Sequence, residues 1–232
     1  MPNAGRGALL AALSRNHWFG GLPLAERELM VAQAESLRLR PGEMLFRQGD
    51  PPSYFYVVVK GTLKMSSLRE DGREAILAVI EAGIWFGEIS LIDHQPRTHD
   101  ATAVATVEVL QLPQASFEAL MTRAVFAQAI AALLAARIRL LYSVVEDATL
   151  RSTRARVARR LLLLAGGDVN LSPERRPRVP VSQEGLAMML GITRQTLSKE
   201  LRKMAAAGVV ELGYGYIEVR SEEGLKALTA TA

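Results

Sequence analysis

The stretch from residue 114 to residue 149 contains no glycine or proline and is rich in alanine and leucine. Both residue types have high intrinsic helix propensity, so an uninterrupted run of them favours one long helix. A helix here divides the chain, because the residues before it and after it follow different patterns. The sequence therefore predicts two domains: residues 1–149, which include the helix, and residues 150–232.

One face of the predicted helix is a candidate dimer interface. Its apolar residues recur at alternating spacings of four and three: Ala127, Ala131, Leu134, Ile138, Leu141, Val145 and Ala148. This repeat is typical of the seam of a two-stranded coiled coil. A second apolar set can cover the preceding domain instead: Leu120, Ile130, Leu133 and Val144. We predict a homodimer through the helix, with a single helix packed on its own domain as the alternative.

Residues 37–112, which precede the helix, are rich in β-forming residues. Short runs of β-branched and aromatic residues alternate with turn signals such as RPGE at 40–43 and QGDPPS at 48–53. Strands repeated every ~8–12 residues are typical of a sandwich or barrel. Gly42, Gly49 and Gly61 lie where tight turns need a positive φ. We therefore expect a β-roll.

Charge differs between the two predicted domains. Residues 1–150 contain 14 Lys and Arg against 16 Asp and Glu, a balance of −2, whereas residues 151–232 contain 14 against 8, a balance of +6. A basic second domain beside a near-neutral first one indicates a polyanion partner for the second domain only. A solvated basic face is the alternative interpretation.

Several functional classes find no support in the composition. The chain has no cysteine, which excludes disulfides, thiolate-bound zinc and cysteine-ligated iron–sulfur clusters and suits a cytoplasmic protein. His17, His94 and His99 form no metal pattern, so no metal is expected, and haem held by histidine lacks support. The sequence shows no nucleophile–base pair and no Walker loop. We therefore do not expect this protein to be an enzyme, and we assign no catalytic residues.

No membrane partner is expected either. No apolar run in the sequence approaches the ~18 residues that a membrane helix needs. The apolar stretch within the first ~16 residues is too short for the core of a signal peptide. We interpret these residues as a loose tail or a helical arm.

Residues 182–204, SQEGLAMMLGITRQTLSKELRKM, have the pattern of a helix-turn-helix. Ser182 and Thr193 can cap the two helices, and Gly191 lies at the turn between them. The second helix has an apolar inner side: Leu197, Leu201 and Met204. Its opposite side has polar and basic residues: Arg194, Gln195 and Lys199.

This second helix has the residue types of a recognition helix. Arginine can donate two hydrogen bonds to guanine, and glutamine can bond adenine directly or through water. The short hydroxyl side chains of Ser182, Thr193 and Thr196 are suited to phosphate contacts, which position the helix without reading sequence. The GVVELGYGYIEVR segment that follows, at 208–220, is interpreted as a hairpin that serves as a wing.

The order of these parts resembles the catabolite activator protein and FNR superfamily of bacterial transcription regulators. The resemblance extends from about residue 18 to residue 221. PGEMLFRQGDPPSYFYVVVKGTLKM, at 41–65, is similar to the opening of the family's cyclic-nucleotide-binding fold, and GITRQTLSKELRKM, at 191–204, is similar to its recognition helix. The implied fold class is α+β: an N-terminal jelly-roll-like β-roll, a long dimerisation helix and a C-terminal winged helix-turn-helix domain.

The resemblance also implies roles for residues in FGEISLIDHQPRTHDA, at 86–101. In the family a Gly-Glu turn opens a short helix that faces a cyclic phosphate, the glutamate accepts from the ribose 2′-hydroxyl and an arginine neutralises the phosphate. The matching positions here are Gly87, Glu88, Ile89, Ser90, Arg97 and Thr98.

Other positions depart from the family's pattern. The catabolite activator contacts adenine with Thr and Ser from its dimer helix, where this chain has Leu141 and Tyr142. His99 and Asp100 follow Arg97 where small or hydroxyl residues are common. The catabolite activator also has glutamate and arginine at the positions of Gln195 and Lys199, so the DNA target implied by the resemblance differs.

Together these features predict a homodimeric transcription regulator. The expected effector is a cyclic nucleotide, in the first place cyclic AMP. Its binding would shift the dimer helix and a hinge near residues 147–153. The expected partners are double-stranded DNA with two-fold symmetric half-sites about 34 Å apart, and RNA polymerase. The alternatives are a ligand-independent regulator in which Glu88 and Arg97 form an ion pair in a vestigial pocket, and a sensor of a cyclic dinucleotide or another small acid.

Overall fold

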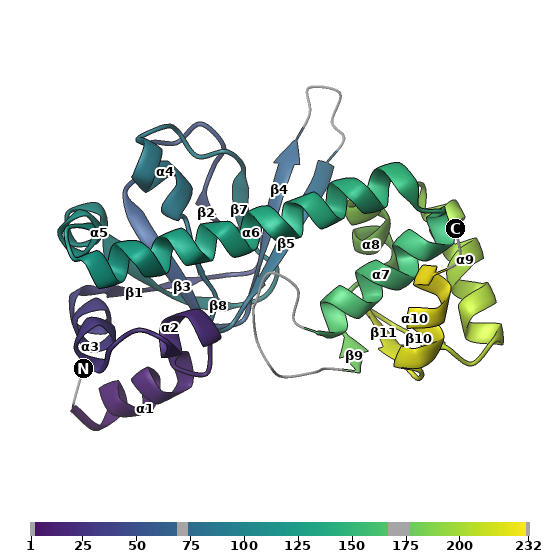
Figure 1. Ribbon diagram of the computed structural model, residues 1–232, viewed down its shortest axis with the longest axis horizontal. Helices are drawn as coiled ribbons and strands as arrows, with labels where there is room; N and C mark the ends of the chain where they lie inside the picture. Colours follow the sequence, from purple (N-terminus) through teal and green to yellow (C-terminus); the bar gives the residue numbers. More distant parts are fainter. Residues whose placement is uncertain (1–2, 69–73, 167–176, 231–232) are drawn as a thin grey trace. The chain divides into compact units, whose positions relative to one another are not determined.

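The computed structural model describes residues 3–68, 74–166 and 177–230 (Figure 1). The described residues up to Ala136 form one compact unit, and those from Arg137 onward form a second. The elements in chain order are α1 (Asn3–Leu13), α2 (His17–Gly20), α3 (Leu24–Gln33), β1 (Glu35–Leu39), β2 (Met44–Phe46), β3 (Tyr54–Lys60), β4 (Thr62–Leu68), β5 (Glu74–Glu81), β6 (Trp85–Phe86), α4 (Glu88–Asp93), β7 (Asp100–Ala103), β8 (Val107–Pro113), α5 (Gln114–Met121), α6 (Ala124–Leu150), α7 (Thr153–Ala165), β9 (Arg178–Val179), α8 (Gln183–Leu190), α9 (Arg194–Ala206), β10 (Val210–Gly213), β11 (Tyr216–Val219) and α10 (Glu222–Ala230).

The N-terminal unit contains the predicted β-roll. One antiparallel sheet has the strand order β1-β8-β3-β6 and the other has the order β2-β7-β4-β5. Inward residues of both sheets, such as Val58, Leu63 and Val109, are fully buried in one apolar cluster. Gly42 and Gly61, at φ values of +82° and +88°, turn the chain as predicted. The β-rich prediction for residues 37–112 is confirmed, although β1, β6 and β7 were not singled out.

A second apolar cluster of this unit attaches helices to the β1-β8-β3-β6 sheet. Trp18 lies edge-on to Phe55 and Phe126, with ring centroids 6.0 and 6.4 Å away. The indole Nε1–H of Trp18 donates to the carbonyl of Ala129 at 2.7 Å, which ties the start of α6 to this unit. The N-terminal segment is a helical arm, α1, and its Leu13 is buried in the same cluster.

The single helix predicted over 114–149 is two helices, α5 and α6. Phe117 and Leu120 are both 1% exposed, so α5 turns to bury them in the N-terminal unit. The Thr122 hydroxyl then donates to the carbonyl of Ala119 at 2.8 Å, and Arg123 pairs with buried Glu26 at 2.7 Å. The interruption is a tertiary effect, because no glycine or proline marks it.

The two predicted faces of the long helix differ in exposure. Ile130 and Leu133 are buried in the N-terminal unit, as predicted for the covering set, whereas Val144 is 40% exposed. The seam residues Ile138 and Val145 are 50% and 55% exposed. An exposed apolar stripe costs free energy in water, so this face is available for a partner helix.

The expectation about membrane-length segments needs a correction. By length and composition α6 could cross a membrane, with a mean hydropathy of 1.7 over its apolar window. Arg137 and Arg139 interrupt the apolar residues of this helix, so the sequence has no unbroken apolar run of that length. A single such helix is weak evidence for a membrane span, because the core helix of a soluble protein passes the same test.

The C-terminal unit is a winged helix-turn-helix. The helices α7, α8 and α9 surround fully buried leucines, among them Leu161, Leu186 and Leu197. The predicted hairpin is formed by β10 and β11, and β9 extends it to a sheet with the order β10-β11-β9. Helix α10, which packs on α7, was not predicted from the sequence.

Candidate effector pocket and nucleic-acid interface

Helix α4 starts from a left-handed glycine. Gly87 has φ +92° and ψ 10°, a conformation that L side chains rarely adopt. Glu88, the first residue of α4, is completely buried, and Ser90 is 3% exposed and donates its hydroxyl to the carbonyl of Pro96 at 3.3 Å. Ile89 faces outward and is 44% exposed. The turn therefore holds a carboxylate inside the N-terminal unit, where burial of a charge needs compensation.

Arg97 lies beside this turn and is only 4% exposed. Its guanidinium donates to the carbonyl oxygens of Gly87 at 2.8 Å and Tyr54 at 2.7 Å. The same group lies over the ring of Phe46, 4.6 Å from the centroid, in a cation–π contact. Burial lowers the pKa of Arg97 below its ordinary value, while the negative charges of Glu88 and Asp50 act in the opposite direction. The structure thus brings Glu88 and Arg97 close enough for the charge of one to influence the other.

We expect Gly87→Ala to weaken both the fold and the pocket. The left-handed φ costs an L residue about 1–2 kcal/mol. An added Cβ would also lie 3.0 Å from the Nη1 of Arg97 and 3.1 Å from the ring of Tyr56, so the arginine must shift. Thermal unfolding and nucleotide titration measure the two effects.

Gly42→Ala is the matched control for this prediction. Gly42 has a similar φ of +82°, but nothing lies within 4 Å of the added Cβ. It should lose stability through strain alone and keep its ligand affinity. Equal ligand affinity in both variants would contradict a role of the Gly87–Arg97 contact in binding.

The residues after Arg97 belong to a loop with its own hydrogen bonds. Thr98 is exposed, and its hydroxyl pairs with Nδ1 of His99 at 2.7 Å. Burial lowers the pKa of His99 below its ordinary value, while the nearby carboxylate of Asp100 acts in the opposite direction. The carboxylate of Asp100 accepts from the backbone N–H of Gln48 at 2.8 Å. Asp100 thus has a structural partner in the adjoining 47–50 turn.

The two adenine positions suggested by the resemblance lie on α6. Leu141 and Tyr142 are 61% and 70% exposed, and both belong to the C-terminal unit. The neighbouring Ser143 donates its hydroxyl to the carbonyl of Leu140 on the same helix, at 2.8 Å. A role of Leu141 and Tyr142 in ligand binding therefore stays a prediction.

In the C-terminal unit the predicted helix caps are confirmed. The Ser182 hydroxyl accepts from the N–H of Gly185 at 3.0 Å and begins α8. Gly191, at φ +64°, ends α8 in the left-handed conformation. The Thr193 hydroxyl accepts from the N–H of Thr196 at 3.1 Å and begins α9. The Thr193 and Thr196 hydroxyls also pair with each other at 2.8 Å, so one of their two protons is left to donate to a phosphate, as is the proton of Ser182.

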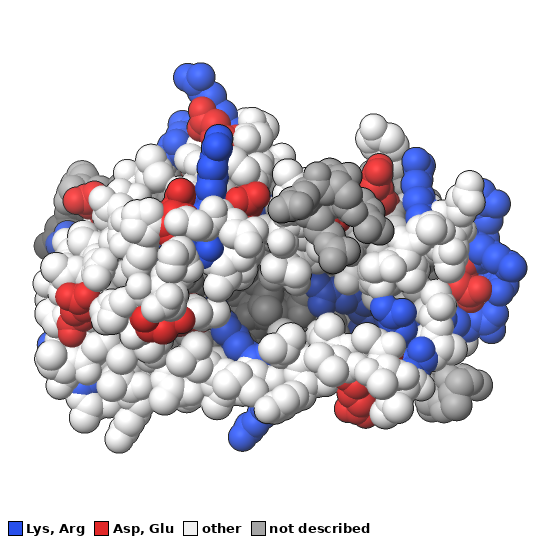
Figure 2. All heavy atoms as spheres, turned by 90° about the horizontal axis from the view of Figure 1, so that it is seen from above, with Lys and Arg blue, Asp and Glu red and all other residues white. Residues whose placement is uncertain are grey.

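Helix α9 exposes the predicted polar side. Leu197, Leu201 and Met204 are buried against α7 and α8, which turns the opposite side of the helix to solvent. That side borders an open groove of about 960 Å³ lined by Gln183, Arg194, Gln195, Ser198, Lys199, Arg202, Lys203 and Leu212. Figure 2 shows Lys and Arg side chains gathered over the C-terminal unit. A groove with several cations and amide groups is suited to a polyanion with readable base edges.

The groove contains residues that sequence reasoning missed. Arg202 and Lys203 line it beside the three predicted base-reading residues, and their spacing from Lys199 could have indicated them. At the wing, the Arg178 guanidinium lies 3.5 Å from the centroid of the Tyr216 ring. The wing tip presents Tyr214, whose side chain is fully exposed.

The parts of the chain that the structure describes contain no group of three or more His, Cys, Asp or Glu side chains that could hold a metal ion.

Comparisons with known proteins agree with this geometry. Residues 36–124 match the cyclic nucleotide-binding domain family, and residues 155–228 match the Crp-like helix-turn-helix domain family. The chain is 34% identical over 203 residues to the cyclic AMP receptor protein of Thermus thermophilus, covering 87% of this chain and 91% of the relative.

Two further proteins are similar to this chain. A CRP-like cAMP-activated global transcriptional regulator of Mycobacterium tuberculosis is 26% identical over 208 residues, covering 86% of this chain and 90% of the relative. The structure of FixK2 from Bradyrhizobium japonicum matches with a TM-score of 0.75 at 24% identity, covering 86% of this chain and 98% of that one. The latter similarity concerns the fold alone.

Proposed function

Because the chain belongs to the CRP/FNR family of transcription regulators, we propose that its effector is a cyclic mononucleotide, cyclic AMP, bound in the β-roll of a homodimer. The family assignment makes it an effector-regulated DNA-binding protein. The proposal adds the identity of the effector, the residues that hold it, the dimer, and the symmetry of the DNA site.

The observation that carries the proposal is the cluster of Gly87, Glu88 and Arg97. A cyclic phosphate has one negative charge, and the guanidinium of Arg97 is a fixed cation with a fork of donors. A ribose 2′-hydroxyl needs an acceptor, which the buried carboxylate of Glu88 supplies. Two relatives are named for cyclic AMP, which favours this nucleotide. Ile89, Ser90, Thr98, Leu141 and Tyr142 complete the proposed pocket.

A ligand-independent regulator is the second candidate. The observation that favours it is that Arg97 already donates to the carbonyls of Gly87 and Tyr54. A phosphate would have to use the remaining donors or replace one of these bonds. Calorimetric titration with cyclic AMP, with cyclic GMP and cyclic di-GMP as controls, separates the candidates. Heat with cyclic AMP supports the first, and no heat with any of the three supports the second.

The proposed DNA contacts follow from the residues around the groove. Arg194, Gln195 and Lys199 would read base edges in the major groove. Ser182, Thr193 and Thr196 would position the helix on phosphates. A homodimer through α6 would present two such helices to half-sites about 34 Å apart on a two-fold symmetric operator. RNA polymerase in the cytoplasm is the proposed further partner.

We expect Arg194→Ala to reduce sequence discrimination. Loss of a bidentate contact to guanine should cost about 1–3 kcal/mol of operator binding and so lower the ratio of operator affinity to unrelated-DNA affinity. Competition titrations at fixed salt measure this ratio.

Lys226→Ala provides the control for the Arg194 variant. Lys226 lies on α10, is largely exposed and does not line the groove. Its replacement removes the same charge but should leave the ratio unchanged. If Arg194→Ala also leaves the ratio unchanged, Arg194 does not read bases.

A further inference from the structure

The end of α6 is attached to the C-terminal unit in an unusual way. Among residues 137–150, all of which the structure describes, only Asp147 is buried, at 8% exposure. Apolar neighbours on the same helix are open to solvent: Leu141, Val145 and Leu150 are 61%, 55% and 72% exposed. The buried apolar cluster of this unit, among the residues described, draws on α7–α10 and the wing and includes none from α6. The attachment is therefore polar.

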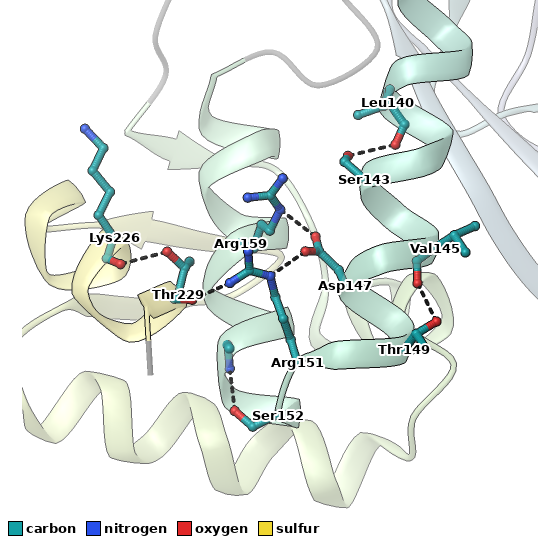
Figure 3. A network of polar contacts seen from close by, with 11 residues as sticks. Leu140, Ser143, Val145, Asp147, Thr149, Arg151, Ser152, Arg159, Lys226 and Thr229 are labelled. Atoms are coloured by element: carbon teal, nitrogen blue, oxygen red, sulfur yellow. Dashed lines mark hydrogen bonds and ion pairs between the residues drawn. The ribbon is translucent and has the colours of Figure 1, made fainter. Parts of the chain in front are cut away.

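Figure 3 shows the Asp147 carboxylate between two arginines. Its Oδ1 pairs with Nε of Arg151 at 2.6 Å, and its Oδ2 pairs with Nε of Arg159, on α7, at 2.6 Å. Arg151 also donates through Nη1 to the carbonyl of Thr229, on α10. We call these contacts among Asp147, Arg151, Arg159 and Thr229 the Asp147 latch. One carboxylate thus connects α6 with α7 and, through Arg151, with α10.

The surroundings of the Asp147 latch give the helix end little other stabilisation. An acidic side chain in the last turn of a helix opposes the helix dipole, so Asp147 does not stabilise α6 by itself. A cavity of about 60 Å³ lies beside it, bordered by Val144 and Ala148 of α6 and Met189 of α8, so apolar packing there is incomplete. Paired charges with loose packing make a joint that can be opened without unfolding the core.

Helix α7 continues from the latch to the DNA-reading helices. Nη2 of Arg156 donates to the carbonyl of Leu190 at 2.6 Å, at the end of α8. Nε of Arg154 pairs with Glu200 of α9 at 2.9 Å. The hydrogen bonds from Lys203 and Arg154 lower the pKa of Glu200, as expected of a bonded carboxylate. A displacement of α7 is therefore passed to both helices of the motif.

We propose that Asp147 is a positioning residue for effector control: its latch fixes the end of α6 to α7, so that movement of α6 on nucleotide binding reorients α9. This inference rests on the proposed function, because it assumes that a nucleotide moves α6. The latch itself is a property of the C-terminal unit and can be tested without a nucleotide.

The first test uses hydrogen–deuterium exchange of the full-length protein without nucleotide. Asp147→Asn should accelerate amide exchange over residues 142–152 by about ten-fold, the factor that one charge-assisted hydrogen bond supports. Glu146→Gln is the matched control, since Glu146 is the neighbouring acid and is exposed. Unchanged exchange in Asp147→Asn overturns the proposal. Arg159→Gln opens the latch from the α7 side and should have the same effect.

The second test measures coupling. DNA affinity is compared with and without cyclic AMP for the wild type, Asp147→Asn, Arg159→Gln and the double variant. The wild type should gain at least about five-fold in affinity on adding the nucleotide. Each variant should lose most of this gain while binding cyclic AMP as before, and the double variant should be no worse than either single one. A full gain in Asp147→Asn overturns the proposal.

The two tests separate the possible failures. If the wild type gains nothing from cyclic AMP, the proposed effector is wrong and the exchange measurement alone decides the latch. If the wild type responds and exchange is faster in Asp147→Asn, yet the gain persists, the latch exists but does not transmit the signal, and the inference is overturned. Thermal unfolding, monitored in parallel, confirms that each variant is folded.

Discussion

Replacing Arg97 with alanine is expected to reduce the affinity for cyclic AMP by about 2–5 kcal/mol, the usual cost of removing one partner of a buried, hydrogen-bonded charge pair. Arg97 is 4% exposed and lies over the Phe46 ring, so water would replace it poorly as a partner for the phosphate. Isothermal titration calorimetry measures the loss directly.

The Arg97 variant needs controls for folding and for charge. Arg97→Ala also removes the hydrogen bonds to the carbonyls of Gly87 and Tyr54, so near-ultraviolet circular dichroism must show that the β-roll is intact. Arg47→Ala removes an exposed arginine from the same unit and should leave binding unchanged. Arg97→Lys keeps the charge without the planar fork and should bind with intermediate affinity. Wild-type affinity in Arg97→Ala would remove Arg97 from the effector site.

Placing aspartate at two seam positions, Ile138→Asp with Val145→Asp, is expected to convert the dimer into monomers. Both side chains are half-exposed in the single chain and would face the partner helix, where unpaired carboxylates would be buried. A monomer engages one half-site at a time, so affinity for the symmetric operator should fall by about 100-fold or more. Light scattering gives the mass, and fluorescence anisotropy gives the DNA affinity.

Arg139→Asp is the control for the seam variant. Arg139 lies on the same helix and is exposed, but it is not one of the predicted seam residues. It introduces the same carboxylate on another side of α6, so the dimer should persist. A dimeric double variant, or a monomeric wild type, would contradict the assignment of this stripe as the dimer interface.

Local sequence patterns predicted the elements that local chemistry determines. Turn glycines such as Gly42 and the helix caps Ser182 and Thr193 were predicted correctly, because each depends on a few neighbouring residues. The break between α5 and α6 was not predicted, since burial of Phe117 and pairing of Arg123 with Glu26 come from tertiary packing. The short strands β6 and β7 were missed because their partners are distant in sequence.

The same distinction applies to the sites. The family resemblance placed Gly87 and Arg97 in one pocket, but the contacts of Arg97 with Phe46 and Tyr54 require strands that are far apart in the chain. The sequence placed Asp147 in a predicted hinge region but did not predict its burial, because an acid on a helix is usually exposed. Its burial depends on Arg159, 12 positions later, and therefore on how α7 folds back.

Control by cyclic AMP and recognition of DNA by a dimer are tested together by selection of DNA from a random pool with the purified protein, with and without cyclic AMP. We expect enrichment of a two-fold symmetric motif, with half-site centres about one helical turn apart, only when the nucleotide is present. Enrichment of an asymmetric motif would contradict the dimeric reading of DNA. Equal enrichment without the nucleotide would contradict control by cyclic AMP.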